Sequence, residues 1–179
     1  DIPSGHKAWS DARTTAGEHN IVSQADRMDP HTGIVLMTAG GNNVGFASVI
    51  ANCFVEFAWS MAKCTNQVNA AESKADSTLQ ETTTFLSHIQ NRLADPTHAR
   101  VILGYPYLVQ AGRDTPATKV PATNVRMTED KFRTKRVETV NAWNKAHTLK
   151  VTYASTTTLF TAHELEPFFI GSDNPPIDR

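Results

Sequence analysis

Three short apolar runs, separated by long amphipathic segments, constrain the fold of this chain more than any other feature. They read "IVLMTA" at 34–39, "RVILGYP" at 100–106 and "KVTYAS" at 150–155. The continuous apolar character of the first run is typical of a strand covered on both faces, and the intervals are long enough for crossover helices. The order strand, helices, strand, helix, strand predicts a three-layer αβα fold of flavodoxin-like type, with a parallel sheet and helices on both faces.

The intervals carry apolar residues at helical spacing. We expect one helix from Phe46 to Met61, a longer one from Cys64 to Leu93, and a third that begins at the N-cap Thr128 and ends near His147. The segment 107–126 contains a glycine and two prolines and is predicted to be a surface loop. The expected inward stripes are Val68, Ala71, Ala75, Leu79, Thr82, Leu86, Ile89 and Leu93 in the long helix, and Phe132, Val137, Val140 and Trp143 in the last.

Composition excludes several classes of protein. With 179 residues, 40% of them apolar, the chain is long enough for one domain with a real core, and no repeat or linker divides it. A formal net charge of −1 argues against a nucleic-acid partner, and the basic run Lys131–Arg136 is predicted to be a solvated helix face. No window contains the ~18 consecutive apolar residues of a transmembrane helix.

The junction "GGNNVG" at 40–45 joins the first strand to the next helix. Paired glycines let another molecule approach the backbone closely, and asparagine amides add donors to the free N–H groups of a helix start. Such a site suits a developing negative charge, either an oxyanion or a phosphate. The alternative, favoured by the local pattern alone, is a tight turn in which Asn42 or Asn43 caps the helix.

Other chemistry is sparse in the sequence. No nucleotide-binding glycine motif is present, and none of the seven histidines forms an i, i+4 pair typical of a metal site, so we expect no metal and no cofactor. Cys53 and Cys64 lack the spacing of a zinc site; they form either a local disulfide or two separate buried thiols.

Several blocks resemble one known family. "VLMTAGGNNVGF" is similar to the "TLTIGGNDxGF" block of SGNH (GDSL-type) ester hydrolases, in their secreted lipase and esterase branch. "ARVILGYPYLV" is similar to that branch's strand and "GYPRLF" turn, and "VTYASTTTLFTAHEL" to its "VTFVDVTSAFAGHEL". "AWSDARTT" resembles the upstream "ACSGATT". The likeness runs in register over nearly the whole chain, although only the GGN block is specific by itself.

The resemblance implies roles for five residues. Asn42 would be the asparagine whose side-chain amide donates to the oxyanion of the tetrahedral intermediate, with Gly41 and Asn43 forming the backbone around it. Cys53 and Cys64 fall where this branch carries a local disulfide, which favours a bridge. The family also implies an extracellular location, an acyl ester or lipid substrate, and a serine nucleophile.

The departures from the family pattern are as informative as the matches. The chain contains neither the GDS block that carries the nucleophilic serine on the family's first strand nor the C-terminal DxxH block. Asp11 stands where the family has an oxyanion-donating glycine, and Trp9 and Glu166 replace cysteines. We find no second catalytic triad. Ser10, Ser48 and Ser155 are candidate nucleophiles, and His163 is the candidate base because it is the histidine expected near the strand ends. The counterpart of His163 in the family is structural, so we expect His163 to be structural as well.

Residues 1–179 are therefore predicted to be a single SGNH hydrolase-like domain without its GDS and DxxH blocks, whose flavodoxin-like sheet is incomplete. Three interpretations remain: the central part of an ester hydrolase, a degenerate binding or structural module of a larger secreted protein, or an unrelated flavodoxin-like domain that binds a small anion at 40–43. We expect no activity from the chain alone. Its strand edges should be covered by missing segments or by a partner chain.

Overall fold

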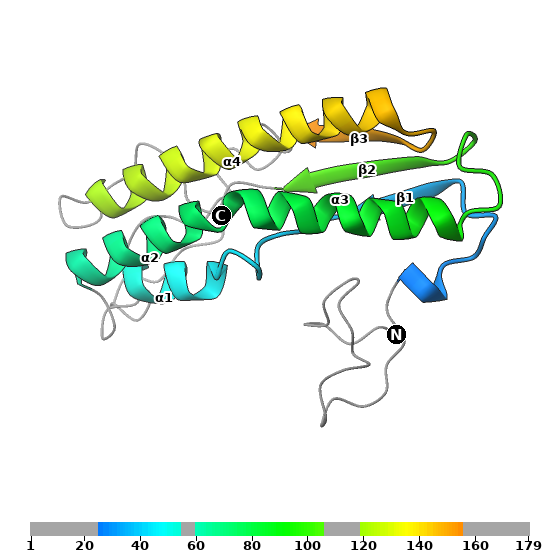
Figure 1. The fold of residues 1–179 in the computed structure, drawn as a ribbon. Helices are drawn as coiled ribbons and strands as arrows, with labels where there is room; N and C mark the ends of the chain where they lie inside the picture. Colours follow the sequence, from blue (N-terminus) through cyan, green and yellow to red (C-terminus); the bar gives the residue numbers. More distant parts are fainter. Residues whose placement is uncertain (1–24, 55–59, 106–118, 156–179) are drawn as a thin grey trace, which may run out of the picture.

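A parallel three-stranded sheet and four helices form the described part of the chain (Figure 1). The computed structural model describes residues 25–54, 60–105 and 119–155, and of residues 119–122 only the backbone. In chain order the elements are η1 (Ala25–Arg27), β1 (Ile34–Met37), α1 (Phe46–Phe54), α2 (Met61–Ser73), α3 (Ala75–Arg92), β2 (Arg100–Tyr105), α4 (Lys119–Ala146) and β3 (Lys150–Ser155).

The sheet confirms the predicted strands and their direction. Its order is β1-β2-β3 and both pairings are parallel, with Val35 beside Val101 and Val101 beside Val151. β1 ends at Met37, two residues before the end of the predicted run, because the chain turns there into the glycine junction. The carboxyl ends of all three strands therefore lie at one edge of the sheet, where ligands meet parallel sheets.

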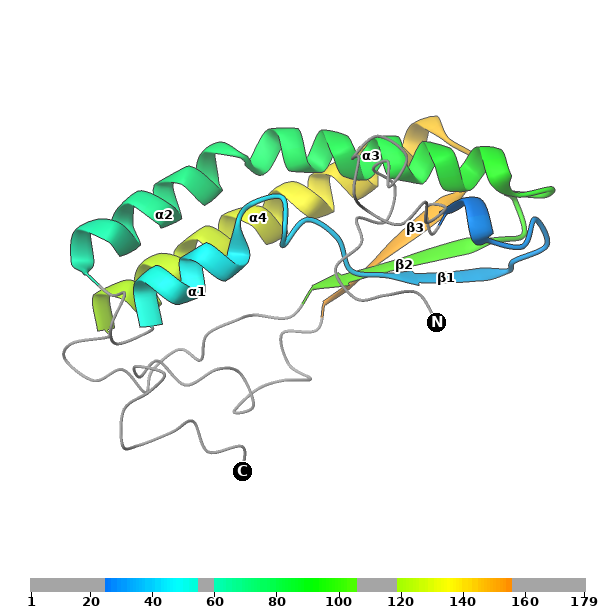
Figure 2. The same ribbon diagram turned by 90° about the horizontal axis from the view of Figure 1, so that it is seen from below.

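The two faces of the sheet are covered differently. Val35 and Met37 of β1 point to the same face as Val101 and Leu103 of β2, and they pack against the core made with α3 and α4. Figure 2 shows α3 and α4 on the same side of the sheet. On the other face, Ile34 and Leu36 are 64% and 73% exposed. The second helical layer of the expected three-layer fold is not found among the described residues.

The long helix predicted from Cys64 to Leu93 is two helices. α2 ends at Ser73 and α3 begins at Ala75, with Lys74 as the residue between them. The backbone N–H of Lys74 reaches back to the carbonyl of Ala71 at 3.2 Å. The break is one residue long and keeps the helical phase, so all eight residues of the predicted inward stripe are buried.

Helix α4 corrects the sequence analysis at two places. It begins at Lys119 rather than at Thr128, so the predicted loop is partly helical and Thr128 is an interior residue. Pro121 falls in the first turn, where a missing N–H is tolerated because it would have no intrahelical acceptor. Phe132, Val140 and Trp143 are buried as expected, but Val137 is 36% exposed and the side chain that is buried is that of Arg136.

A second core joins α1, α2 and α4 away from the sheet. It contains Val49, Phe54 and Val68, and the disulfide Cys53–Cys64 that links α1 to α2. The predicted bridge is thus confirmed. At the start of α2 the Ser60 hydroxyl accepts a hydrogen bond from the Lys63 backbone N–H at 3.1 Å, which caps the helix. No helix in the described ranges is long and apolar enough to cross a membrane.

Candidate functional site

The glycine junction forms a tight loop between β1 and α1. Gly40 and Gly45 adopt φ angles of +100° and +76°, a region that favours glycine. The backbone N–H of Val44 donates to the Gly40 carbonyl at 3.1 Å, and that of Phe46 to the Gly41 carbonyl at 3.0 Å. These bonds close the loop onto the first turn of α1 and hold residues 41–43 at the carboxyl end of β1.

The two asparagines of this loop have different surroundings. The Asn43 amide Nδ2 donates to the Glu81 carboxylate, which fastens the loop to α3. Asn42 is exposed, and its side chain makes no hydrogen bond to any residue that the structure describes. Its backbone carbonyl accepts from Gly45 N–H at 3.1 Å. The loop is therefore braced by Asn43, while the Asn42 amide has no partner among the described residues.

Backbone donors accompany that amide. Within the described residues, no backbone carbonyl accepts a hydrogen bond from the N–H groups of Gly41, Asn42 or Asn43. Free backbone donors beside a helix start are the groups that stabilise an oxyanion or another small anion.

A groove of about 750 Å³, which we term the edge groove, runs along β1 to this loop. Its walls come from η1, from Ile34–Met37 with the following junction, and from α3, and Asn42 lies at its lining. In the described part of the chain β1 pairs only with β2, and β3 likewise pairs only with β2. Among the described residues, the outer edge of β1 therefore has no partner strand beside the groove. Residues 1–24, which precede β1 in the chain, lie outside the described residues.

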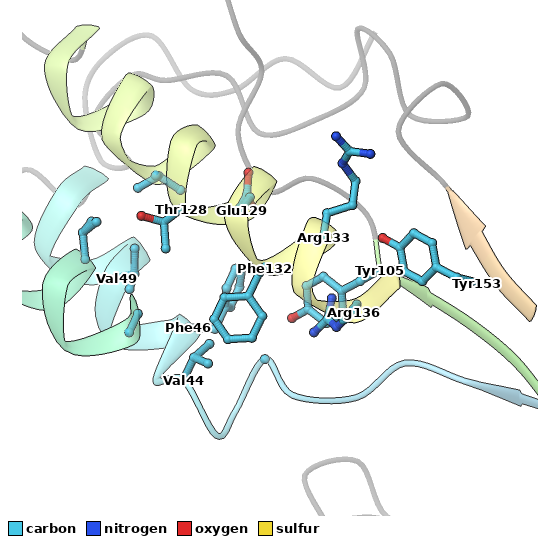
Figure 3. Close-up of a pocket in the computed structure, with 14 residues that line it drawn as sticks. Val44, Phe46, Val49, Tyr105, Thr128, Glu129, Phe132, Arg133, Arg136 and Tyr153 are labelled. Carbon is cyan, nitrogen blue, oxygen red and sulfur yellow. The ribbon is translucent and has the colours of Figure 1, made fainter. Parts of the chain in front are cut away.

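A second, smaller pocket of about 70 Å³ lies behind the loop, between α1, α2, α4 and the strand ends (Figure 3). We term it the helix pocket. Its lining residues are Gly41, Val44, Phe46, Val49, Val68, Ala71, Tyr105, Val125, Thr128, Glu129, Phe132, Arg133, Arg136 and Tyr153. Gly41 and Tyr105 line both cavities. A Cβ at Gly41 would collide with the Tyr105 hydroxyl, so the absence of a side chain at Gly41 allows the tyrosine to lie between them.

Arg136 brings an unexpected charge into the helix pocket. It is only 6% exposed, and its Nη2 donates to the Ala39 carbonyl at 2.8 Å. Its guanidinium carbon lies 4.6 Å from the centroid of the Tyr105 ring and 5.5 Å from that of Phe132. Burial lowers the pKa of Arg136, and the tyrosines Tyr153 and Tyr105 oppose this shift. The same burial raises the pKa of the Tyr105 hydroxyl above its ordinary value.

The structure brings residues from the carboxyl-terminal parts of β2 and β3 to the junction that follows β1. Tyr105 at the end of β2 contacts the junction after β1, and Tyr153 on β3 lines the same pocket. Sequence reasoning missed Arg136, which it assigned to a solvated basic face. The only signal was that Arg136 follows Phe132 by four positions and so shares its helix face.

The other sequence candidates do not join this site within the described residues. Ser48 is exposed on α1, and Ser155 is exposed at the last residue of β3. The remaining positions lie outside the described residues: Trp9, Ser10, Asp11, His163 and Glu166.

Comparisons with known proteins find similarity to Streptomyces lipases in sequence and in fold. No family model matches the chain. Lipase 1 of Streptomyces coelicolor is 29% identical over 147 residues, which are 81% of this chain and 51% of that protein. The crystal structure of an extracellular lipase from Streptomyces rimosus gives a TM-score of 0.61 at 17% identity, covering 82% of this chain and 57% of the lipase.

The crystal structure of phospholipase A1 from Streptomyces albidoflavus gives a TM-score of 0.53 at 21% identity, covering 79% of this chain and 56% of that protein. At these identities the likeness to solved structures shows the fold. The chain spans about half the length of the relatives that it matches.

Proposed function

We propose that the chain, which is similar to Streptomyces lipases in sequence and fold, supplies the oxyanion-binding part of an SGNH-type carboxylic ester hydrolase. Asn42 is the residue assigned to this chemistry. Its side-chain amide, with the backbone N–H groups of Gly41 and Asn43, donates hydrogen bonds to the oxygen that becomes negative when a serine attacks an acyl ester.

One observation carries the proposal: the Asn42 amide is exposed beside the edge groove, while its neighbour Asn43 is engaged with Glu81. If both amides braced the turn, the loop would be a structural cap. Because Asn43 performs the bracing, Asn42 can donate to a substrate without weakening the loop. A donor that is held in place before the reaction stabilises the transition state without a cost of reorganisation.

The nucleophile belongs to a different segment in this proposal. A further parallel strand pairs with the outer edge of β1 and brings a serine to the mouth of the edge groove, opposite Asn42. The exposed edge of β1 and the size of the groove support this placement. The substrate is an acyl ester or a lipid, and the disulfide Cys53–Cys64 supports an extracellular location.

A chimera tests the proposal directly. The 179-residue chain replaces the matching region of Lipase 1, so that it is joined to the remaining segments of that protein, and hydrolysis of p-nitrophenyl butyrate is measured. We expect turnover that falls about 10²–10³-fold in Asn42→Ala, mainly in kcat, because a transition-state donor is lost. The unfused 179-residue chain is expected to show no turnover.

A matched variant separates chemistry from folding. Asn43→Ala weakens the loop but leaves the Asn42 amide in place, so its kcat should fall much less than that of Asn42→Ala. Full activity of the Asn42→Ala chimera would contradict the oxyanion role.

A second function is favoured by one feature of the sequence, the aspartate at position 11. A carboxylate at a family oxyanion position opposes a developing negative charge. A folded but inactive chimera that gains turnover in Asp11→Gly would assign the chain to a catalytically inactive SGNH-like binding or structural module.

A further inference from the structure

The glycine loop between β1 and α1 is attached to two helices. On one side, the Asn43 amide donates to the Glu81 carboxylate of α3. On the other side, the Nη2 atom of Arg136 in α4 donates to the Ala39 carbonyl at 2.8 Å, directly before the paired glycines. The segment that carries Asn42 is therefore bonded to a different helix before and after that residue.

The backbone enters this loop through a narrow gap between the same two helices. A Cβ at Gly40 would lie 2.8 Å from the Cγ2 atom of Thr78 on α3 and 3.0 Å from the Nη2 atom of Arg136 on α4. Both distances are shorter than ordinary van der Waals contacts. The Arg136 side chain thus forms one wall of the gap, in addition to its hydrogen bond.

Arg136 is itself held in place by aromatic rings (Figure 3). It is buried, and its guanidinium carbon lies 4.6 Å from the centroid of the Tyr105 ring and 5.5 Å from that of Phe132. The Tyr105 hydroxyl in turn lies where a Gly41 Cβ would be. A planar guanidinium can stack with its face while its edge donates, which the compact ammonium of a lysine cannot do. Arg136 therefore reaches the loop directly at Ala39 and, through the tyrosine ring, beside Gly41.

We infer that Arg136 is a positioning residue for the oxyanion donors: its bond to Ala39 and its stacking on Tyr105 fix the backbone that carries Asn42. Arg136 acts through the loop and does not contact the substrate. Because the Glu129 carboxylate lines the same pocket, the inference depends on the hydrogen bond and packing of Arg136 and not on its charge. It rests on the proposed function, to which it adds the residue that aligns the donor.

Nitrogen-15 relaxation of the 179-residue chain tests the positioning without any turnover. The backbone amides of residues 41–43 should have order parameters of about 0.85 in the wild type, as in rigid backbone, and below about 0.6 in Arg136→Met. Lys135→Met is the matched control, because it removes a cation from the same helix at a side chain that is 43% exposed and paired with Asp76. It should leave the order parameters unchanged.

The chimera with Lipase 1 tests the consequence for catalysis. Arg136→Met should lower kcat by about 10- to 100-fold with little change in KM, since a misplaced donor weakens binding of the transition state alone. In the Asn42→Ala background the same change should lower kcat less than about threefold, because the donor that Arg136 positions is already absent. A general loss of structure would lower kcat by the same factor in both backgrounds, and that result would overturn the inference.

Arg136→Lys replaces Arg136→Met if circular dichroism and thermal melts show that the methionine variant does not fold. It keeps the stem and the charge without the planar fork, so it should show both changes at smaller size. Unchanged order parameters at residues 41–43 in a folded Arg136 variant would overturn the inference. Full activity of the Asn42→Ala chimera would instead contradict the proposed function, and the order parameters would still decide whether Arg136 holds the loop.

Discussion

Leu103 and Leu36 lie on adjacent strands of one sheet, yet one is 1% exposed and the other 73%. Leu103 points toward α3 and α4, where it joins a core with Leu86 and Ile89. Leu36 points to the opposite face, which no described helix covers. The difference follows from the pleat of the strands, since side chains of odd and even positions point to opposite faces.

One half of the fold is covered by the described residues, and the other half is not covered by any of them. The covered half contains both cores, the disulfide and the helix pocket. The open half contains the bare face, the free edge of β1 and the edge groove, which is where the proposed nucleophile would enter. Exposed apolar side chains of this size on an edge strand are typical of a surface that other residues or another molecule cover.

The largest expected difference between the two halves is in the cost of removing a leucine side chain. Leu103→Ala should lower the free energy of unfolding by about 3 kcal/mol, because it leaves a cavity in the core. Leu36→Ala should change it by less than about 0.5 kcal/mol, because the side chain is already exposed. Urea denaturation measures both values. A cost of about 2 kcal/mol or more for Leu36→Ala would mean that the bare face is covered in solution.

Removing the disulfide is expected to have the next largest effect. The Cys53→Ser, Cys64→Ser double variant should lower the free energy of unfolding by about 2–3 kcal/mol, because the bridge closes a loop of eleven residues. A matched test compares the wild-type chain with and without reducing agent. If reduction leaves the urea midpoint unchanged, the bridge does not stabilise the covered half.

The neighbouring asparagines allow a finer comparison between a braced and a free side chain. Asn43→Ala should lower the free energy of unfolding by about 1–2 kcal/mol, because the Glu81 carboxylate loses its donor. Asn42→Ala should leave it within about 0.5 kcal/mol of the wild-type value. Equal destabilisation by the two variants would show that Asn42 also braces the loop, and this would weaken its assignment to the oxyanion.

The smallest expected effect is at Asp95, which is fully exposed between α3 and β2. The Thr97 hydroxyl, at 2.5 Å, is the main cause that lowers the pKa of Asp95 to about 2, with help from His98 and the Thr97 backbone N–H. Because the folded-state pKa is depressed, the contribution to stability is present above pH 4 and is lost as the pH falls toward 2.

Carbon-13 titration of the Asp95 carboxyl checks this assignment. The wild-type midpoint should lie near pH 2, and Thr97→Val should raise it toward the ordinary value of 3.8. Identical midpoints in the two proteins would contradict the role of the hydroxyl.

The sequence predicted the strands well and the helix boundaries less well. The predicted runs at 100 and 150 begin at the observed first residues of β2 and β3. Each run starts with a charged residue, Arg100 or Lys150, and continues with apolar and β-branched residues, a pattern typical of a strand. The break at Lys74 leaves the apolar spacing almost unchanged, so no pattern marks it. The early start of α4 was missed because a proline usually interrupts a helix. Pro121 is tolerated since it lies in the first turn, and the sequence does not reveal that position.

The candidate site was predicted in part. The paired glycines pointed to the junction, and the family resemblance selected Asn42 from two adjacent asparagines that are identical in type. Only the coordinates distinguish their surroundings, because the partner of Asn43 is Glu81, thirty-eight residues further along the chain. The role of Arg136 was not predictable for the same reason, since the carbonyl it contacts is ninety-seven residues away.

By itself the sequence determined the parallel strands, the inward stripe of α2 and α3, the glycine loop and the positions of the two cysteines. These features depend on the periodicity and the backbone preferences of neighbouring residues. The tertiary structure alone decided which face of the sheet the described helices cover, which asparagine is bonded to Glu81, and that one arginine of a basic run is buried. Each of these depends on contacts between distant segments, whose free energies exceed the local preference of any single side chain.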